Sequence, residues 1–300
     1  MAYNHRSDKA WPLSNLPPVG PIKENDYIGS IAYQGGVVQY ATFQGKRPYQ
    51  EDRWLIKAGL GATNGAEAQN FLRKMFKKAT EDTRGMFAGS TATAAIITPD
   101  HQLNIAYLGD SPVILIIRDP ATGVVMQTEY LIRPHHPGDP QEKARIEAAG
   151  GTVVDECIIG KNGRWLALSR SFGDAPFKGV STEIEMVTRD LSAEIQEGME
   201  VYVCVASDGL TAVGGKPNLA FVLERAVLEE KTDRLAEIFA TYAYQSGSTD
   251  NITALVTRVP EKMTESVFLN VDDGDGGYET ADAVQKSFAK RLELPPPPQL

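Results

Sequence analysis

Short apolar runs separated by turn residues dominate the first half of the chain. Three of them, at 92–97, 103–108 and 113–117, are divided only by Pro99-Asp100 and by Gly109-Asp110-Ser111-Pro112. Runs this close together leave no room for crossover helices, so they predict an antiparallel meander. Further strands are predicted at 37–43, 199–206 and 252–259.

A second pattern, with apolar residues three and four positions apart, predicts helices. Residues 65–78 place Ala68, Leu72 and Met75 on one face. Residues 140–149 begin with Pro and end at a Gly pair, and 218–230 and 233–245 form a further helical pair. Because strands and helices come in blocks, the predicted fold class is α+β, with antiparallel sheets and helices packed outside them.

Composition divides the chain into three parts. Residues 1–34 are polar and carry four prolines, which predicts an extended arm. Residues 35–260 are predicted to be the folded domain, and 261–300 a tail with one amphipathic helix at 279–294. The proline run at 295–298 is of the kind that SH3-type domains bind, although a plain tail is the simpler interpretation. The acidic segment 272–277 lacks the spacing of a calcium loop and is interpreted as a turn.

Charge and cysteine content narrow the possible partners. Thirty basic and 39 acidic residues give a formal net charge of −9. Such a chain repels polyphosphates, so nucleic acid is not expected as a partner. Cys157 and Cys204 are expected to be buried free thiols of a reducing compartment. Since no apolar run is long enough to span a membrane, we expect a cytoplasmic protein, with export by another route left open.

Carboxylates stand at the ends of several predicted strands. Glu51 and Asp52 follow the strand at 37–43, Asp208 follows the strand that ends at 206, and Asp250 precedes the strand at 252. A buried carboxylate is costly unless a positive charge neutralises it. Brought together, such residues would form a hard-oxygen site for Mg²⁺ or Mn²⁺. Taken singly, each Asp is equally consistent with a helix cap or a turn.

The order of short motifs along the chain favours a shared metal site over separate helix caps and turns. RPYQEDR (47–53), GSTA (89–92), LGDS (108–111), LSRSFGD (168–174), ASDGL (206–210) and STDNI (248–252) follow one another, with a further matching segment at 135–153. The series resembles the PPM family, the metal-dependent type 2C Ser/Thr protein phosphatases, over about residues 37–259. The resemblance implies an αββα sandwich, a binuclear Mn²⁺ or Mg²⁺ site at one end, and a phosphorylated protein as substrate or partner.

The resemblance also implies roles for individual residues. Asp208 and Asp250 are similar to direct metal ligands, Glu51 and Asp52 to the acidic pair beside the metals, and Asp110 to a ligand of a third, weaker ion. Arg47 is similar to the guanidinium that grips the substrate phosphate in a bidentate fork. Bound metal would lower the pKa of a coordinated water and stabilise charge on the phosphoryl oxygens.

One family motif is missing from its expected place. The Asp-Gly-His-Gly-Gly block, whose Asp bridges both metals and whose His protonates the leaving alcohol, should lie between Asp52 and the next helix. Alignment on that helix puts Gly61 at the Asp position and Thr63 at the His position. The block is therefore interpreted as absent, with a core strand deleted.

Two functions remain open. The chain is either a phosphatase with an altered metal centre or a pseudophosphatase that binds phosphoproteins as a scaffold. A dinucleotide loop at 59–65 is a third interpretation, disfavoured because strands and helices do not alternate.

Overall fold

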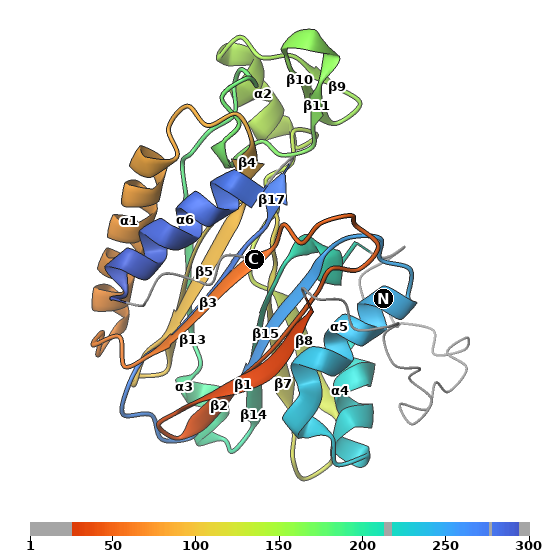
Figure 1. Ribbon diagram of the computed structural model, residues 1–300. Coiled ribbons are helices and arrows are strands. Elements are labelled where there is room, and N and C mark those ends of the chain that lie inside the picture. The colour runs from red at the N-terminus through yellow and green to blue at the C-terminus, as the bar shows by residue number, and fades with distance from the viewer. Residues whose placement is uncertain (1–25, 213–217, 276–277, 294–300) are drawn as a thin grey trace.

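Two antiparallel sheets pack face to face and helices cover their outer faces (Figure 1). This computed structural model describes residues 26–212, 218–275 and 278–293. The first sheet has the order β1-β2-β15-β14-β7-β8, and the second the order β13-β6-β5-β16-β3. The predicted α+β sandwich is confirmed.

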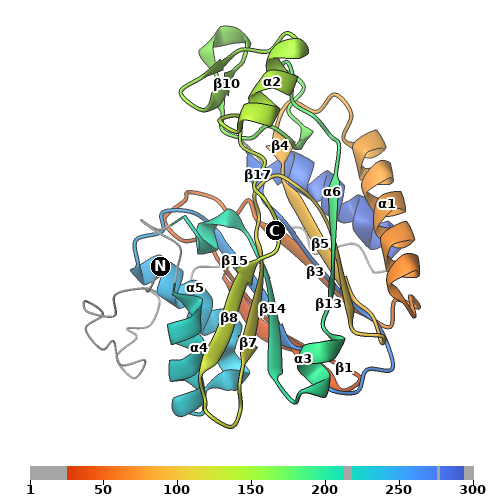
Figure 2. The ribbon, with the colours of Figure 1, turned by 180° about the vertical axis from the view of Figure 1, so that it is seen from behind.

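The strands of the first sheet are β1 (Tyr27–Tyr33), β2 (Gly36–Phe43), β7 (Val113–Arg118), β8 (Val125–Tyr130), β14 (Glu200–Ala206) and β15 (Ile252–Arg258). Helices α4 (Leu219–Leu228) and α5 (Leu235–Gln245) cover its outer face. The strands of the second sheet are β3 (Arg53–Ala58), β5 (Ala92–Ile97), β6 (Gln102–Leu108), β13 (Glu185–Asp190) and β16 (Val267–Asp272). Helices α1 (Gly65–Asp82) and α6 (Tyr278–Arg291) cover that sheet, as Figure 2 shows from behind.

Alternation along the strands explains the layers. In β14, Val201, Val203 and Val205 point into the core between the sheets, whereas Tyr202 and Cys204 point toward α4 and α5. Successive side chains of a strand face opposite sides, so a strand covered on both faces is apolar throughout. Cys204 is buried and Cys157 partly buried, and both are free thiols.

The C-terminal segment belongs to the core. β16 lies between β5 and β3 and pairs antiparallel with both, and α6 packs on α1 with the rings of Phe288 and Phe76 5.2 Å apart. The predicted tail from residue 261 is therefore wrong, although the helix predicted within it is confirmed. The acidic turn is also wrong, because Asp272 is a fully buried strand residue. Asn270, whose amide donates to the Thr93 carbonyl oxygen (3.1 Å), is a buried polar residue that interrupts the apolar run expected of a central strand.

The predicted N-terminal arm overlaps β1, which pairs along its whole length with β2. Residues 1–25 and the proline run at 295–298 lie outside the described residues. No helix in the described ranges is both long and apolar enough to span a membrane.

A small subdomain stands on one end of the sandwich, at the top of Figure 1. It comprises α2 (Pro140–Ala148), β9 (Val153–Val154), β10 (Cys157–Ile159) and β11 (Trp165–Leu166), around a small core of its own. Buried Glu142 anchors it, accepting hydrogen bonds from Arg145 (2.8 Å) and Arg170 (2.6 Å). The shorter elements are β4 (Gly89–Ser90), β12 (Phe172–Gly173), β17 (Gly274–Asp275), α3 (Ser192–Gln196) and single 3₁₀ turns at Lys161–Gly163, Asp208–Leu210 and Thr232–Arg234.

Candidate metal centre

The acidic residues meet at one end of the sandwich because the strands that carry them alternate in direction. In the first sheet, β14 ends just before Asp208 and its neighbour β15 begins just after Asp250. In the second sheet, β3 begins just after Asp52 and its neighbour β16 ends just before Asp273. Antiparallel neighbours place the end of one strand beside the start of the next, so each pair of positions lies at one end of its own sheet. The two ends face each other, because Asp273 of the second sheet interacts with Asp208 of the first.

Asp273 is the carboxylate that the sequence analysis missed. Its side chain is half-buried and shares hydrogen bonds with the carboxyl groups of Asp52 and Asp208. Its main chain is tied to the GSTA motif: Thr91 N donates to the Asp273 carbonyl oxygen (2.9 Å), and Asp273 N donates to Thr91 Oγ1 (3.2 Å). The sequence pattern Asp-Gly-x-Gly-Gly at 273–277, which matches the missing family motif except at its third position, could have identified Asp273.

Burial and mutual repulsion raise the pKa values of three of these carboxyl groups, those of Asp52, Asp208 and Asp273. Burial raises the pKa of Asp52 to about 7, and burial together with the charge of Asp250 raises that of Asp208. Burial and the charges of all three neighbours raise the pKa of Asp273 well above its ordinary value. Ionising one group disfavours ionisation of the next, so the cluster retains protons unless a cation replaces them.

The donor set fits a hard divalent cation. The buried oxygens Asp52 Oδ1 and Asp208 Oδ1 accept no hydrogen bond from an N–H or hydroxyl group in the described part of the chain. Two carboxylates in contact need a shared proton or a shared cation, and carboxylate oxygens are the ligands that Mg²⁺ and Mn²⁺ prefer. Among described side chains, no three Asp, Glu, His or Cys converge as a preformed metal cage. A cation would therefore draw these side chains together.

Arg47 lies at the rim of the cluster. Its Nη2 donates to Asp250 Oδ2 (2.7 Å), and its Nη1 lies 3.7 Å from Glu51 Oε2. The hydrogen bond to Asp250 raises the pKa of the guanidinium. Nearly half of the side chain is exposed (46%), so its remaining N–H groups are accessible to a ligand that approaches from solvent.

Asn251 holds the loop that carries Arg47. Its Nδ2 donates to the carbonyl oxygens of Gln44 and Tyr49 (both 2.9 Å), and its Oδ1 accepts from Glu51 N (2.8 Å). These three hydrogen bonds tie residues 44–51 to the start of β15. This role was not predicted, although Asn251 belongs to the STDNI motif.

Three motif segments join in a small sheet beside the cluster. β4 of the GSTA motif pairs with β12 of LSRSFGD on one side and with β17, which follows Asp273, on the other. Asp110 of LGDS is close to this sheet, since its neighbour Ser111 hydrogen-bonds Thr91 through the two hydroxyl groups (2.8 Å). Three of the motifs and the segment after Asp273 thus contribute to the same end of the molecule.

Gly61 and Thr63 lie far from the cluster. Gly59 N donates to the carbonyl oxygen of Ser266, beside the start of β16, whereas Asp273 follows the end of that strand. A strand of six residues spans about 20 Å. Both residues are exposed in the loop from β3 to α1, where Thr63 hydrogen-bonds Glu67. The positions aligned with the missing Asp and His therefore lie away from the acidic cluster. A dinucleotide loop stays disfavoured, because the strands before and after this segment, β3 and β5, are not neighbours: β16 lies between them and pairs antiparallel with both.

His135 is close to the cluster but already engaged. Its Nδ1 accepts a hydrogen bond from Gly109 N (3.0 Å), and its ring stacks on Tyr107 at 4.9 Å between centroids. Burial and the charge of Arg170 lower its pKa to about 4. A histidine that stays neutral above this pH is a poor proton donor for a leaving alcohol at neutral pH.

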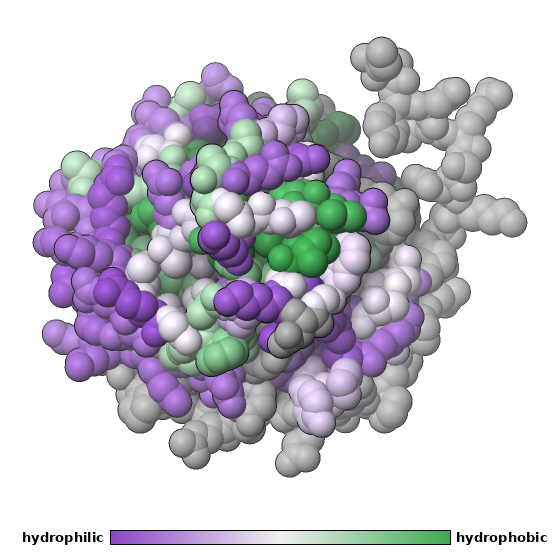
Figure 3. Space-filling view, turned by 90° about the horizontal axis from the view of Figure 1, so that it is seen from above, coloured by the Kyte–Doolittle hydropathy of each residue, from purple (hydrophilic) through white to green (hydrophobic). Residues whose placement is uncertain are grey.

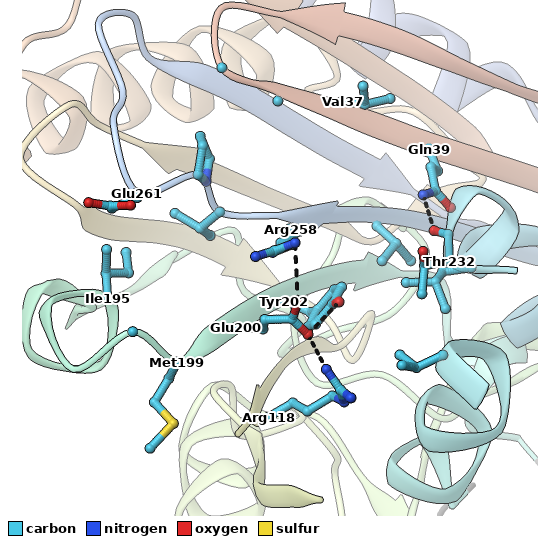
Figure 4. A pocket seen from close by; sticks show the side chains of 18 of the residues that line it. Val37, Gln39, Arg118, Ile195, Met199, Glu200, Tyr202, Thr232, Arg258 and Glu261 are labelled. Atoms are coloured by element: carbon cyan, nitrogen blue, oxygen red, sulfur yellow. Dashed lines mark hydrogen bonds and ion pairs between the residues drawn. The ribbon is translucent and has the colours of Figure 1, made fainter. Parts of the chain in front are cut away.

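A pocket of about 700 Å³ lies at the opposite end of the first sheet (Figure 4). It borders the starts of β2 and β14 and the end of β15, whereas the acidic cluster lies at their other ends. Glu200 in this pocket accepts from Arg118 (2.6 Å) and lies 3.2 Å from Arg258. The charge of Glu200 is thus neutralised by the two arginines. The candidate site for metal binding is therefore the acidic cluster and not this pocket.

A two-sheet sandwich covered by helix pairs, with crowded carboxylates and an accessible arginine at one end, defines the class of αββα phosphatase domains. The model of the family described as "Protein phosphatase 2C" matches residues 29–252, more than half of the chain. The chain belongs to this family. The match ends before β16 and α6 begin.

Related proteins agree with this assignment. The chain is 34% identical to human "Protein phosphatase 1F" over 212 residues, which are 69% of this chain and 42% of that protein. It is 32% identical to "Probable protein phosphatase 2C 59" of Arabidopsis thaliana over 193 residues, 64% of this chain and 57% of that protein. The chain thus spans less than two thirds of the length of these relatives.

Solved structures agree on the fold. A serine-threonine phosphatase 2C from Toxoplasma gondii superposes with a TM-score of 0.60 at 20% identity, over 78% of this chain and 98% of that one. A C. elegans sex determining protein superposes with a TM-score of 0.56 at 23% identity, over 76% of this chain and 66% of that one.

Proposed function

We propose that the chain is a Mn²⁺- or Mg²⁺-dependent phosphoprotein phosphatase whose metal centre is completed from its C-terminal segment. Asp52, Asp208, Asp250 and Asp273 are the proposed metal-holding carboxylates. The observation that carries the proposal is the contact of Asp273 with Asp52 and Asp208. A bridging carboxylate has to reach ligands from both sheets, and Asp273 touches one from each.

The C-terminal segment takes the place of a segment missing earlier in the chain. β3 connects to α1 through only six residues, 59–64, where the family has a strand and the Asp-Gly-His-Gly-Gly block. β16 lies beside β3 and α6 packs on α1. The sequence 273–277 then reads Asp-Gly-Asp-Gly-Gly, with Asp275 at the position of the histidine. This supports a displaced block in place of a deleted one.

The other side chains have distinct proposed roles. When bound, the metal ions supply an activated water and stabilise negative charge on the phosphoryl group. Arg47 holds the substrate phosphate with its exposed N–H groups, and Asn251 positions Arg47 through the loop. Glu51 accepts from water at the rim of the cluster, and Asp110 contributes with Asp208 to a weaker additional cation site.

Phosphoprotein binding without turnover is the second candidate function. It is favoured because the sequence has Asp275 at the histidine position of the displaced motif, and because burial lowers the pKa of His135 to about 4. Without an acid for the leaving alcohol, the rate is expected to fall by roughly 10²–10⁴-fold relative to a fully equipped site.

Phosphate release from a phosphothreonine peptide in the presence of Mn²⁺ tests the proposal. We expect release that needs metal, is lost in Asp208→Asn, and is unchanged in the matched control Asp233→Asn, an exposed aspartate remote from the cluster in sequence. If folded protein with bound Mn²⁺ releases nothing above background, the phosphatase proposal fails and phosphoprotein binding takes its place.

A further inference from the structure

A basic groove lies between α1 and α6 on the outer face of the second sheet. Five basic side chains line it: Lys74, Lys77, Lys78, Lys290 and Arg291. Two acidic side chains, Glu81 and Asp82, face them, so the groove carries an excess of three positive charges. The chain as a whole carries −9, which makes this local excess opposite in sign to its surroundings.

Internal contacts account for only part of the positive charge. Lys78 pairs with Asp82, and the Arg291 guanidinium lies 5.4 Å from the centroid of the Phe71 ring. Lys74 and Lys77 are exposed, and no acidic side chain of the described residues lies within ion-pair distance of either.

The groove and the proposed metal centre are connected by one helix. α6 begins at Tyr278, just after the segment that carries Asp273, and Lys290 lies twelve residues further along. At 1.5 Å per residue, this places the groove about 18 Å from the start of α6. Figure 1 shows α6 running from β17 toward α1, and Figure 3 shows hydrophilic residues covering the side on which α1 lies.

We propose that this groove, Lys74, Lys77, Lys78, Lys290 and Arg291, binds an acidic segment of the phosphoprotein on which the metal centre acts. The role as a substrate dock rests on the proposed function, whereas binding of an acidic peptide does not. An extended chain advances about 3.3 Å per residue, so the acidic segment lies about six or more residues from the phosphorylated residue. Lysines attract carboxylates and phosphates as point charges, which makes the interaction dependent on salt.

Binding is measured first, without metal and without turnover. A fluorescein-labelled, unphosphorylated peptide of eight Glu and Asp residues is titrated with the full chain and followed by fluorescence anisotropy. Lys74→Glu/Lys77→Glu is expected to weaken binding at least tenfold, and Lys74→Gln/Lys77→Gln by a smaller factor. The matched control Lys143→Glu/Lys262→Glu, at two exposed positions outside the groove, makes the same charge change and is expected to stay within twofold.

Three outcomes would overturn the proposal. The first is that the groove variant and the control variant, both shown to be folded, bind the peptide with equal affinity. The second is that the unmodified chain does not bind the peptide at low salt. The third is that the chain binds phosphatidylserine vesicles through the groove and does not bind the peptide.

Phosphate release is then compared for two phosphothreonine peptides, one with an acidic cluster six residues from the phosphothreonine and one without it. For the peptide with the cluster, the groove variant should raise KM and leave kcat unchanged. If the chain binds the peptide through the groove but releases no phosphate, the proposed acidic-peptide site is supported and only the proposed phosphatase activity is contradicted.

Discussion

Phe288→Ala tests whether the C-terminal helix belongs to the folded domain. Phe288 lies on the face of α6 that packs on α1, is fully buried, and has its ring 5.2 Å from that of Phe76. Truncation removes the apolar contacts of the ring and leaves a cavity between the two helices. Substitutions of this kind cost about 3–5 kcal/mol of unfolding free energy.

The loss corresponds to a melting temperature lowered by roughly 10 °C, because about 1 kcal/mol shifts a domain of this size by about 2–4 °C. Urea unfolding followed by circular dichroism measures the loss of unfolding free energy. The m-value, the slope of the unfolding free energy against urea concentration, is expected to stay unchanged. Lys286→Ala, at an exposed position of the same helix, is the matched control and should stay within about 0.5 kcal/mol. A cost below about 1 kcal/mol for Phe288→Ala would refute the packing of α6 and restore the interpretation of a tail.

The Arg47 loop, the far pocket and the buried carboxylates give three further expectations. Asn251→Ala removes hydrogen bonds to residues 44–51 and should cost about 1–3 kcal/mol in urea unfolding and lower phosphate release. Glu200→Gln leaves the buried Arg118 without its carboxylate and should cost about 3 kcal/mol, with Mn²⁺ affinity unchanged. In metal-free protein, the unfolding free energy of the unmodified chain minus that of Asp52→Asn should fall by roughly 3–4 kcal/mol between pH 4 and pH 7, because burial raises the folded pKa of Asp52 from 3.8 to about 7.

Each expectation has an outcome that contradicts it. Normal activity in Asn251→Ala would mean that the loop is held by other contacts. Weaker Mn²⁺ binding in Glu200→Gln would mean that the two ends of the sheet are coupled. For the titration, a raised folded pKa gives stability that is complete below the unfolded pKa of 3.8 and is lost as the pH rises through about 7. A difference from Asp52→Asn that stays constant over this range would contradict the burial of Asp52.

Much of the fold follows from local patterns in the sequence. The strands at 92–97, 103–108 and 113–117 have uninterrupted apolar runs with turn residues between them, and each lies within one residue of its predicted bounds. Asp52, Asp208 and Asp250 were grouped because each stands at a strand end. Asp208 and Asp250 come together because their strands are antiparallel neighbours in the first sheet, whereas Asp52 joins them because the second sheet packs face to face with the first.

The C-terminal contribution was missed for a physical reason. β16 is a central strand that carries buried Asn270 and Asp272, whose polar side chains are tolerated because they hydrogen-bond each other (2.9 Å). The apolar run of this strand therefore stops after three residues, Val267–Leu269, and no regular alternation follows it. Pairing between β16 and β3, more than 200 residues apart in sequence, leaves no local trace. Asp273 therefore became a ligand candidate only once the sheet order was known.

Mn²⁺ binding to Asp273→Asn tests the central claim most directly. Isothermal titration of metal-free protein should give a dissociation constant at least tenfold higher for Asp273→Asn than for the unmodified chain, and an unchanged one for Asp233→Asn. Since the substitution also relieves repulsion among the carboxylates, the metal-free variant should melt at a higher temperature than the metal-free parent. Mn²⁺ affinity and melting temperature both equal to those of the parent would contradict the placement of Asp273 in the metal centre.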